Sequence, residues 1–223
     1  MSVLVVIPAR KGSIRLPHKN RKILCGIPLI NWSINIAKKL KFIDDIIITT
    51  NDEIILKKLK KDNFVKILKR PDKLSQNNTK LIDAIIHAIN FYEKKFKKIK
   101  TVLLLQPTSP LRSLNLINLG YKKYIGFKKK KSIVSVSKGS NPEKRSFKIN
   151  KKKFKLYLKK KIINNMFQIN GNFYFASVTF IKKYKSFFKD GKTYPVILNS
   201  TKYSIDIDTI KDFKKVEKFL KNS

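Results

Sequence analysis

Cysteine and long apolar runs are scarce in this chain of 223 residues. Cys25 is the single cysteine, which excludes an internal disulfide and a zinc site built from several cysteines. The apolar run Val3–Ile7 stops at Pro8 and is too short to cross a membrane, and the sequence carries no signal-peptide pattern. We therefore expect a cytoplasmic protein with no membrane partner.

Acidic residues and arginine are also scarce, whereas lysine is abundant. The chain has 52 Lys and Arg against 14 Asp and Glu, a formal net charge of +38, and only six of the basic residues are arginine. Proteins that read nucleic acids usually rely on arginine, because its planar fork grips phosphates and guanine edges in pairs. We attribute the charge to a lysine-rich composition and expect no specific nucleic-acid partner. A non-enzymatic protein that binds polyanions, RNA or a membrane surface stays open as an alternative.

The first half of the chain alternates strand-like and helix-like segments. Apolar runs predict strands at 3–7, 45–49, 64–68 and 101–105, and helical patterns lie between them at 28–40, 52–61 and 79–96. This alternation implies an α/β fold with a mainly parallel sheet flanked by helices. Ligands bind beyond the carboxyl ends of the strands in such sheets. The loops that follow the first, second and fourth strands should therefore share one edge.

The second half is less regular. Patterns there predict strands at 132–137, 172–177 and 203–207 and a closing helix at 209–220. Residues 139–170 are mostly polar and lysine-rich, with β-like pieces at 147–149 and 154–158. This stretch is either an exposed loop or a protruding arm for dimer contacts. Because we find no repeat and no clear linker, we expect a single domain over residues 1–223.

The loop after the first strand is rich in cations. Arg10, Arg15 and Lys19 lie near Gly12, which permits close backbone approach, so the loop could neutralise a triphosphate. It is not a P-loop, since no Gly-Lys-Ser/Thr step opens a helix. An ordinary basic loop is the alternative.

Two acids stand close together near the end of the chain. Asp206 and Asp208 are two residues apart in a stretch that reads as extended, so both side chains should face the same way. Beside a basic pocket they suit a Mg²⁺ ion that bridges phosphate oxygens. The alternative is structural, with Asp208 capping the last helix and Asp206 paired with a lysine.

A third segment, Leu105–Arg112, is a turn-rich loop at a strand end. Its two prolines fix the backbone, while Gln106, Thr108 and Ser109 offer polar groups to a ligand. A rigid connecting turn is the competing interpretation.

Taken together, these segments resemble the acylneuraminate (CMP-sialic acid) cytidylyltransferases. The resemblance runs over essentially the whole chain and rests on the opening IPARKGSIRLPHKN, Arg70-Pro71, the loop QPTSPLR, NGNFYFA at 170–176 and the late DIDT. It implies a fold of the nucleotide-diphospho-sugar transferase type, Mg²⁺ as the cofactor, and CTP and an acidic nine-carbon sugar as substrates. It also implies a homodimer whose partner arms help to close the sugar site.

The resemblance assigns roles by position. Arg10, Lys19 and Asp208 would be catalytic, and Asp206 and Asp208 would hold the metal ion. The residues expected to bind the nucleotide are Arg10, Ser13, Lys19, Asn20, Arg70 and Thr79. Those expected to bind the sugar are Gln106, Asn170, Tyr174, Phe187 and Phe188, the two phenylalanines from the same or the other subunit.

The chain departs from the family pattern at a few positions. Lys11 and Ile14 stand where the opening motif commonly has Gly and Lys, and Gln168 stands where many members have an arginine suited to the sugar carboxylate. A family member that binds nucleotide without reacting is therefore an alternative, as are enzymes for legionaminic, pseudaminic or Kdo-type acids. The Kdo enzymes usually read Lys-Pro where this chain has Lys19-Asn20.

Overall fold

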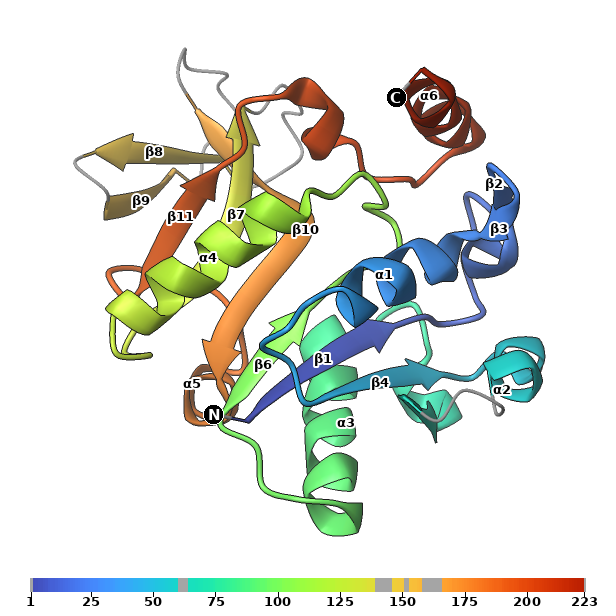
Figure 1. The fold of residues 1–223 in the computed structure, drawn as a ribbon, viewed down its shortest axis with the longest axis horizontal. Helices are drawn as coiled ribbons and strands as arrows, with labels where there is room; N and C mark the ends of the chain where they lie inside the picture. The colour runs from blue at the N-terminus through green and yellow to red at the C-terminus, as the bar shows by residue number, and fades with distance from the viewer. Residues whose placement is uncertain (1, 60–63, 139–145, 151–152, 158–165, 223) are drawn as a thin grey trace.

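A single mixed β-sheet forms the centre of the protein (Figure 1). The computed structural model describes every residue except 1, 60–63, 139–145, 151–152, 158–165 and 223. Seven strands follow one another in the order β11-β7-β10-β6-β1-β4-β5. Their bounds are β1 Val3–Pro8, β4 Asp45–Thr50, β5 Val65–Lys69, β6 Thr101–Leu104, β7 Ser132–Lys138, β10 Phe167–Ser177 and β11 Thr193–Ile197.

The sheet is mainly parallel, as the sequence predicts. Strands β5, β4, β1 and β6 run parallel to one another, β11 runs parallel to β7, and β10 lies antiparallel between β6 and β7. Strands β1, β4 and β6 are buried along almost their whole length because helices cover both sides of the sheet.

Helices form a layer on each face of the sheet. Helices α1 (Leu29–Lys38) and α4 (Leu114–Gly126) pack against one face, and α3 (Leu81–Lys95) and α5 (Val178–Tyr184) pack against the other. Alternate side chains of β1 explain this arrangement, since Val3 and Val5 belong to the first core cluster and Leu4 belongs to the second. Helix α6 (Ile210–Lys221) packs on a third cluster beside the loop after β1.

The shorter elements lie at the ends of these strands. Helix α2 (Glu53–Leu59) follows β4 and is capped by Asp52, whose carboxylate accepts hydrogen bonds from two backbone amides. Strands β2 (Ile23–Leu24) and β3 (Ile27–Pro28) form a small separate hairpin. Three short 3₁₀ turns complete the fold at Lys19–Arg21, Asp72–Leu74 and Thr201–Ser204.

The order of the strands creates a switch point between β1 and β6. The chain leaves β1 through α1 towards β4 on one side, whereas β6, on the other side of β1, is reached through α3. Loops that follow neighbouring strands then diverge and leave a crevice at the carboxyl ends. The sequence-based expectation that the loops after β1 and β6 share one edge is confirmed by the pocket that they line together.

The expected strand at 203–207 is wrong. Residues 201–204 form a 3₁₀ turn, and residues 205–208 pair with no strand among the described residues. The apolar-polar alternation there has another cause, because Ile207 is buried in the third cluster while the next residue, Asp208, lines the pocket. The alternation therefore reflects one residue in the core and the next at the pocket, and not a strand.

Helices α4 and α5 and strand β11 are among the elements not expected from the sequence. Ser113 caps α4 and Ser177 caps α5. Each serine side chain accepts a hydrogen bond from the backbone amide of the third residue of its helix. Strand β11 contains Pro195, which disguises it in the sequence. Proline is tolerated at the edge of a sheet, and β11 is an edge strand.

A hairpin occupies part of the stretch expected to be an arm or a loop. Strands β8 (Ser146–Asn150) and β9 (Lys153–Tyr157) pair with each other, and β8 continues onto β10. The hairpin projects from the sheet in Figure 1. The remaining positions of the 139–170 stretch before residue 166 lie outside the described residues, and its use in dimer contacts stays a prediction.

Gly120 lets helix α4 approach the sheet closely. A Cβ atom at this position would lie 2.6 Å from a ring carbon of Phe173, whereas one at Gly126 in the same helix would meet no atom within 4 Å. We expect Gly120→Ala to lower the free energy of unfolding by about 1–3 kcal/mol through overpacking. Gly126→Ala, the matched control, should leave stability unchanged or raise it by up to about 1 kcal/mol. Urea denaturation measures both, and equal stabilities would contradict the close approach.

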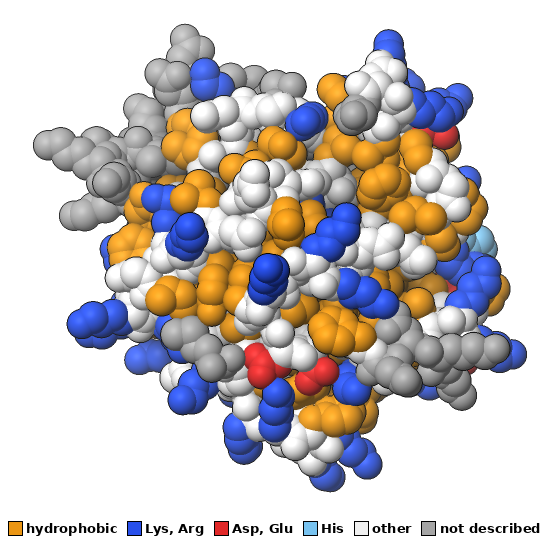
Figure 2. Space-filling model, in the orientation of Figure 1, with side chains coloured by type: hydrophobic (Ala, Val, Ile, Leu, Met, Phe, Trp, Pro, Cys, Tyr) orange, Lys and Arg blue, Asp and Glu red, His pale blue; other side chains and the backbone are white. Residues whose placement is uncertain are grey.

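Positive charge is distributed widely over the surface. On the face seen in Figure 2, Lys and Arg side chains are scattered among apolar and uncharged ones and form no continuous patch. None of the helices in the described part of the chain combines the length and apolarity that crossing a membrane would require.

Candidate functional site

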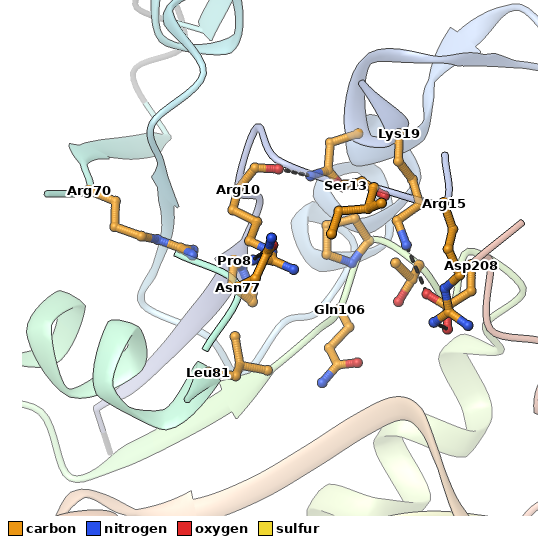
Figure 3. Close-up of a pocket in the computed structure, with 14 residues that line it drawn as sticks. Pro8, Arg10, Ser13, Arg15, Lys19, Arg70, Asn77, Leu81, Gln106 and Asp208 are labelled. Carbon is orange, nitrogen blue, oxygen red and sulfur yellow. Dashed lines mark hydrogen bonds and ion pairs between the residues drawn. The ribbon is translucent and has the colours of Figure 1, made fainter. Parts of the chain in front are cut away.

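A pocket opens at the switch point between β1 and β6 (Figure 3). It encloses about 410 Å³. It is lined by Pro8, Arg10, Ser13, Ile14, Arg15, Lys19, Asn20, Arg70, Asn77, Leu81, Gln106, Pro107, Thr108 and Asp208. Five of the six residues expected to bind the nucleotide are among them.

Two guanidinium groups stand on one side of the pocket. Arg10 reaches across to residues 75–77 and donates to the Gln76 carbonyl at 3.1 Å and to Asn77 Oδ1 at 2.9 Å. Arg70 is 3% exposed and is held at the end of β4, where it donates to the Thr49 carbonyl and hydroxyl. In the part of the chain that the structure describes, neither guanidinium is paired with a carboxylate.

The surroundings of Arg70 destabilise its charged form. Burial, and then the positive charge of Arg10, lower the pKa of the Arg70 guanidinium to about 10. Arg70 therefore stays protonated at neutral pH. Two like charges without acidic partners, set in a pocket, are the arrangement expected at an anion site.

The opposite side of the pocket holds an ion-paired acid. Asp208 accepts a hydrogen bond from Lys19 Nζ at 3.0 Å and one from Arg15 at 2.8 Å, as the dashed lines in Figure 3 show. Lys19 Nζ also donates to the Ile207 carbonyl at 2.7 Å, which fixes its position. The alternative in which Asp208 caps α6 is wrong, because Thr209 caps that helix together with Asp212.

The loop after β1 supplies further lining residues of the pocket. Asn20 is 8% exposed and donates through Nδ2 to the Arg10 carbonyl, so it braces the loop from inside. Ser13 lines the pocket, as does Ile14, whose side chain is 76% exposed. Arg15 brings a cation to the pocket wall next to Ile14, where the family pattern commonly has lysine.

Gln106 marks the far end of the pocket, below the cations in Figure 3. Next to it lies Gly171, which has a positive φ of 78° and sits in an irregularity of β10 between Ile169 and Tyr174. A Cβ atom on Gly171 would lie 3.1 Å from Gln106 Oε1. Asn170 is therefore adjacent in sequence to a backbone position that touches the pocket wall.

A half-buried cation, Arg112, connects the segments at this end of the site. Arg112 donates to the carbonyl of Gln106, to Asn172 O at 2.7 Å and to Ser33 Oγ at 2.9 Å. Burial lowers the pKa of Arg112 to about 9, and the nearby charge of Asp206 partly offsets this effect. Burial and then the same carboxylate raise the pKa of Tyr174. Asp206 is thus close to both Arg112 and Tyr174.

Six of the expected site residues lie outside the pocket lining: Thr79, Asn170, Tyr174, Asp206, Phe187 and Phe188. The Thr79 hydroxyl donates to the Lys73 carbonyl at 2.9 Å, which places it in the turn before α3. Phe187 is buried in the second core cluster with its ring 5.6 Å from that of Tyr174, and Phe188 packs against the same cluster. Within one subunit these rings therefore belong to the core beside β10.

The donor set at Asp206 and Asp208 can be compared with what Mg²⁺ requires. No three His, Cys, Asp or Glu side chains among the described residues come together closely enough to hold a metal ion alone. Mg²⁺ is usually bound by one or two carboxylates together with substrate phosphates. Asp208 at the pocket wall fits this requirement, whereas Asp206 lies beside Arg112 and does not line the pocket.

Some lining residues were missed from the sequence. Asn77 and Leu81 enter the pocket because Arg10 holds residues 75–77 and because Leu81 begins α3. Asn77 lies in a run of polar residues, and no local pattern separates it from its neighbours. Only the contact with Arg10, 67 residues away, brings it to the site.

The sequence matches a family model described as cytidylyltransferase over residues 4–222. A CMP-N,N'-diacetyllegionaminic acid synthase from Legionella pneumophila is 33% identical, covering 99% of this chain and 97% of that protein. A pseudaminic acid cytidylyltransferase from Campylobacter jejuni is 30% identical over 67% of this chain and 64% of its own length.

Solved structures share the fold at low sequence identity. The structure of CMP:2-keto-3-deoxy-manno-octonic acid synthetase with CTP superposes with a TM-score of 0.79 and 13% identity, covering 100% of this chain and 99% of that one. A glucose-1-phosphate thymidylyltransferase from Bacillus anthracis gives a TM-score of 0.74 and 14% identity over 99% and 96% of the two chains. The sheet is thus of the nucleotide-diphospho-sugar transferase type, and with the match over residues 4–222 the chain belongs to the cytidylyltransferase family.

Proposed function

We propose that this protein transfers CMP from CTP to the anomeric hydroxyl of a sialic-acid-like nonulosonic acid and releases pyrophosphate. The observation that carries the proposal is the pocket at the switch point, with two guanidinium groups on one side and a lysine-bound carboxylate on the other. A triphosphate needs cations without acidic partners, and Arg10 and Arg70 meet that need among the described residues.

The chain's own residues would act by positioning and by neutralising charge. The anomeric oxygen attacks the α-phosphorus in line, the bond from that phosphorus to the bridging oxygen breaks, and pyrophosphate leaves. Arg10 and Lys19 would stabilise the charge that grows on the pyrophosphate, and Arg70, Ser13 and Asn20 would hold the nucleotide. No covalent intermediate with the protein is needed.

Asp208 would bind magnesium together with the phosphates. Asp206 lies beside Arg112 in this structure and would have to turn towards the pocket to serve as a second ligand. A Mg²⁺ ion held there would polarise the α-phosphate and would neutralise part of its charge. Arg15 and Lys19 hold Asp208 in this structure and also line the pocket, so they would stand beside the bound phosphates.

The sugar would occupy the end of the pocket at Gln106. Asn170 and Tyr174 lie next to that end, and their places beside Gly171 and Asp206 support a role in binding the acidic sugar. Phe187 and Phe188 would contribute to the sugar site from the same subunit or from its partner in a homodimer. Thr79 would support nucleotide binding indirectly, because its bond to the Lys73 carbonyl holds the turn that carries Asn77.

Closely related cytidylyltransferases differ in the sugar acid that they use. The similarity to the Legionella pneumophila protein over nearly the full chain supports a legionaminic-type acid as the substrate. This alternative fits about as well as a neuraminic acid. A polyanion-binding protein without enzymatic activity is the alternative from another class, motivated by the charge of +38.

Pyrophosphate release tests the proposal directly. The protein is incubated with CTP and Mg²⁺ and with one acid at a time from a panel of neuraminic, legionaminic, pseudaminic and Kdo types. We expect release with at least one nine-carbon acid and little release with ATP or GTP. Salt-resistant binding of RNA together with no release from any acid would support the alternative, because screening should weaken nonspecific binding of polyanions.

A further inference from the structure

A chain of hydrogen bonds fixes one buried side-chain amide in the irregular part of β10. The amide of Phe173 donates to Ser135 Oγ at 3.0 Å, and the Ser135 hydroxyl donates in turn to Asn170 Oδ1 at 2.6 Å. The amide of Asn172 donates to the same Asn170 oxygen at 3.2 Å. Ser135 is 0% exposed and Asn170 is 3% exposed.

These bonds determine which way round the Asn170 carboxamide lies. A backbone N–H can only donate, so the Asn172 amide requires the oxygen of Asn170 on its side. With the oxygen on that side, the Ser135 hydroxyl, which accepts a bond from Phe173, gives its own proton to the same oxygen. The Asn170 Nδ2 group is thereby turned the other way.

No acceptor meets Nδ2 in the described part of the chain. Nδ2 is buried and makes no hydrogen bond there. The side-chain oxygen and the backbone carbonyl of Asn170, in contrast, both accept hydrogen bonds. A buried donor without a partner costs about 1–3 kcal/mol, so a donor with no partner among the described residues points to a ligand or an ordered water.

The location indicates what that partner is. The Asn170 carbonyl accepts a bond from Ser109 Oγ, and the next residue, Gly171, lies against Ser109 and against Gln106 at the end of the pocket. The backbone that carries this carboxamide thus lies against the end of the site where the acidic sugar, and not the nucleotide, would be held.

We propose that Ser135 is a positioning residue that holds the Asn170 amide nitrogen ready to donate to an oxygen of the acidic sugar. The inference rests on the proposed function. Ser135 itself touches no substrate; its hydroxyl acts through Asn170. Loss of the hydroxyl removes one of the two bonds that fix the carboxamide and leaves only the longer bond from the Asn172 amide, so the donor is presented in a smaller share of the molecules.

Ser135→Ala and Ser132→Ala form a matched pair. Both serines lie on β7 and are 0% exposed, but the Ser132 hydroxyl bonds the Thr193 hydroxyl and not Asn170. We expect Ser135→Ala to weaken sugar binding about tenfold, the effect of one orienting hydrogen bond, and to leave CTP binding unchanged. Ser132→Ala should change neither affinity. The split between the two substrates separates positioning from a general loss of structure.

Binding is measured apart from turnover. N-acetylneuraminic acid and N,N'-diacetyllegionaminic acid are titrated calorimetrically into protein saturated with a CTP analogue that has carbon between the α and β phosphates. Asn170→Asp is the second variant, because a carboxylate still accepts the bonds from Ser135 and Asn172 but has no N–H to donate. We expect it to lose sugar affinity more than tenfold.

Each result then has one meaning. Weaker binding of the sugar acid alone, in both Ser135→Ala and Asn170→Asp, supports the inference even if the wild type proves to release no pyrophosphate, which would overturn only the proposed function. Unchanged sugar affinity in either variant overturns the inference and leaves a buried water as the partner of Nδ2. Failure of the wild type to bind either acid, or equal losses for CTP and sugar, also overturns it.

Discussion

Asp208→Asn should lower kcat by roughly 10²–10³-fold while the protein stays folded. The neutral amide keeps the size of the side chain but loses the charge that holds Lys19 and Arg15 and that would bind Mg²⁺. Helix α6 should survive the change, because its capping box consists of Thr209 and Asp212. Steady-state pyrophosphate release at saturating substrates, with circular dichroism for the fold, measures the effect.

Glu217→Gln is the control for the Asp208 variant. It makes the same change of charge in the same C-terminal segment, at an acid that pairs with Lys221 on the surface of α6. Its kcat should match the wild type. Near-normal turnover in Asp208→Asn would rule out both the metal role and the importance of the ion pairs.

Arg10→Ala should reduce kcat/KM by a similar factor of roughly 10²–10³. The change removes a guanidinium from the anion side of the pocket and also releases residues 75–77, which Arg10 holds through Gln76 and Asn77. KM for CTP should rise together with the fall in kcat. Arg10→Lys should recover only part of the loss, because lysine keeps the charge without the planar fork.

Lys11→Ala tests whether overall charge explains the result. Lys11 is the next residue of the same loop, but its side chain is exposed and does not line the pocket. In a chain of +38, the loss of one such cation should leave kcat/KM within about twofold of the wild type. If both variants lose activity equally, the site depends on bulk charge and not on Arg10.

The sequence was informative about the fold where one physical signal dominated. Strands β1, β4 and β6 are runs of apolar residues buried on both faces, and their bounds agree with expectation to within a residue. Prediction failed where a signal was mixed. Pro195 disguised an edge strand, and the alternation at 205–208 came from a coil between a core cluster and a pocket.

The site followed from topology more than from motifs. Parallel strands had to deliver Arg10 and Gln106 to one edge, and the pocket contains both. The pairing of Lys19 with Asp208, 189 residues apart, depends on where α6 packs, which local sequence does not encode. The same holds for Thr79, whose hydroxyl bonds the turn before α3, and for Ser135, whose partner is set by an irregular strand pairing.

The positions of the arginines have a consequence for how this protein tolerates change. Arg10, Arg15 and Arg70 line the pocket, and Arg112 fastens its far end. The fifth described arginine, Arg21, pairs with buried Asp52 next to the same loop. In a chain with 52 Lys and Arg, of which only six are arginine, five arginines thus gather at or beside one site. Because the planar guanidinium donates several hydrogen bonds in fixed directions, exchange for lysine at these five positions is not a conservative replacement.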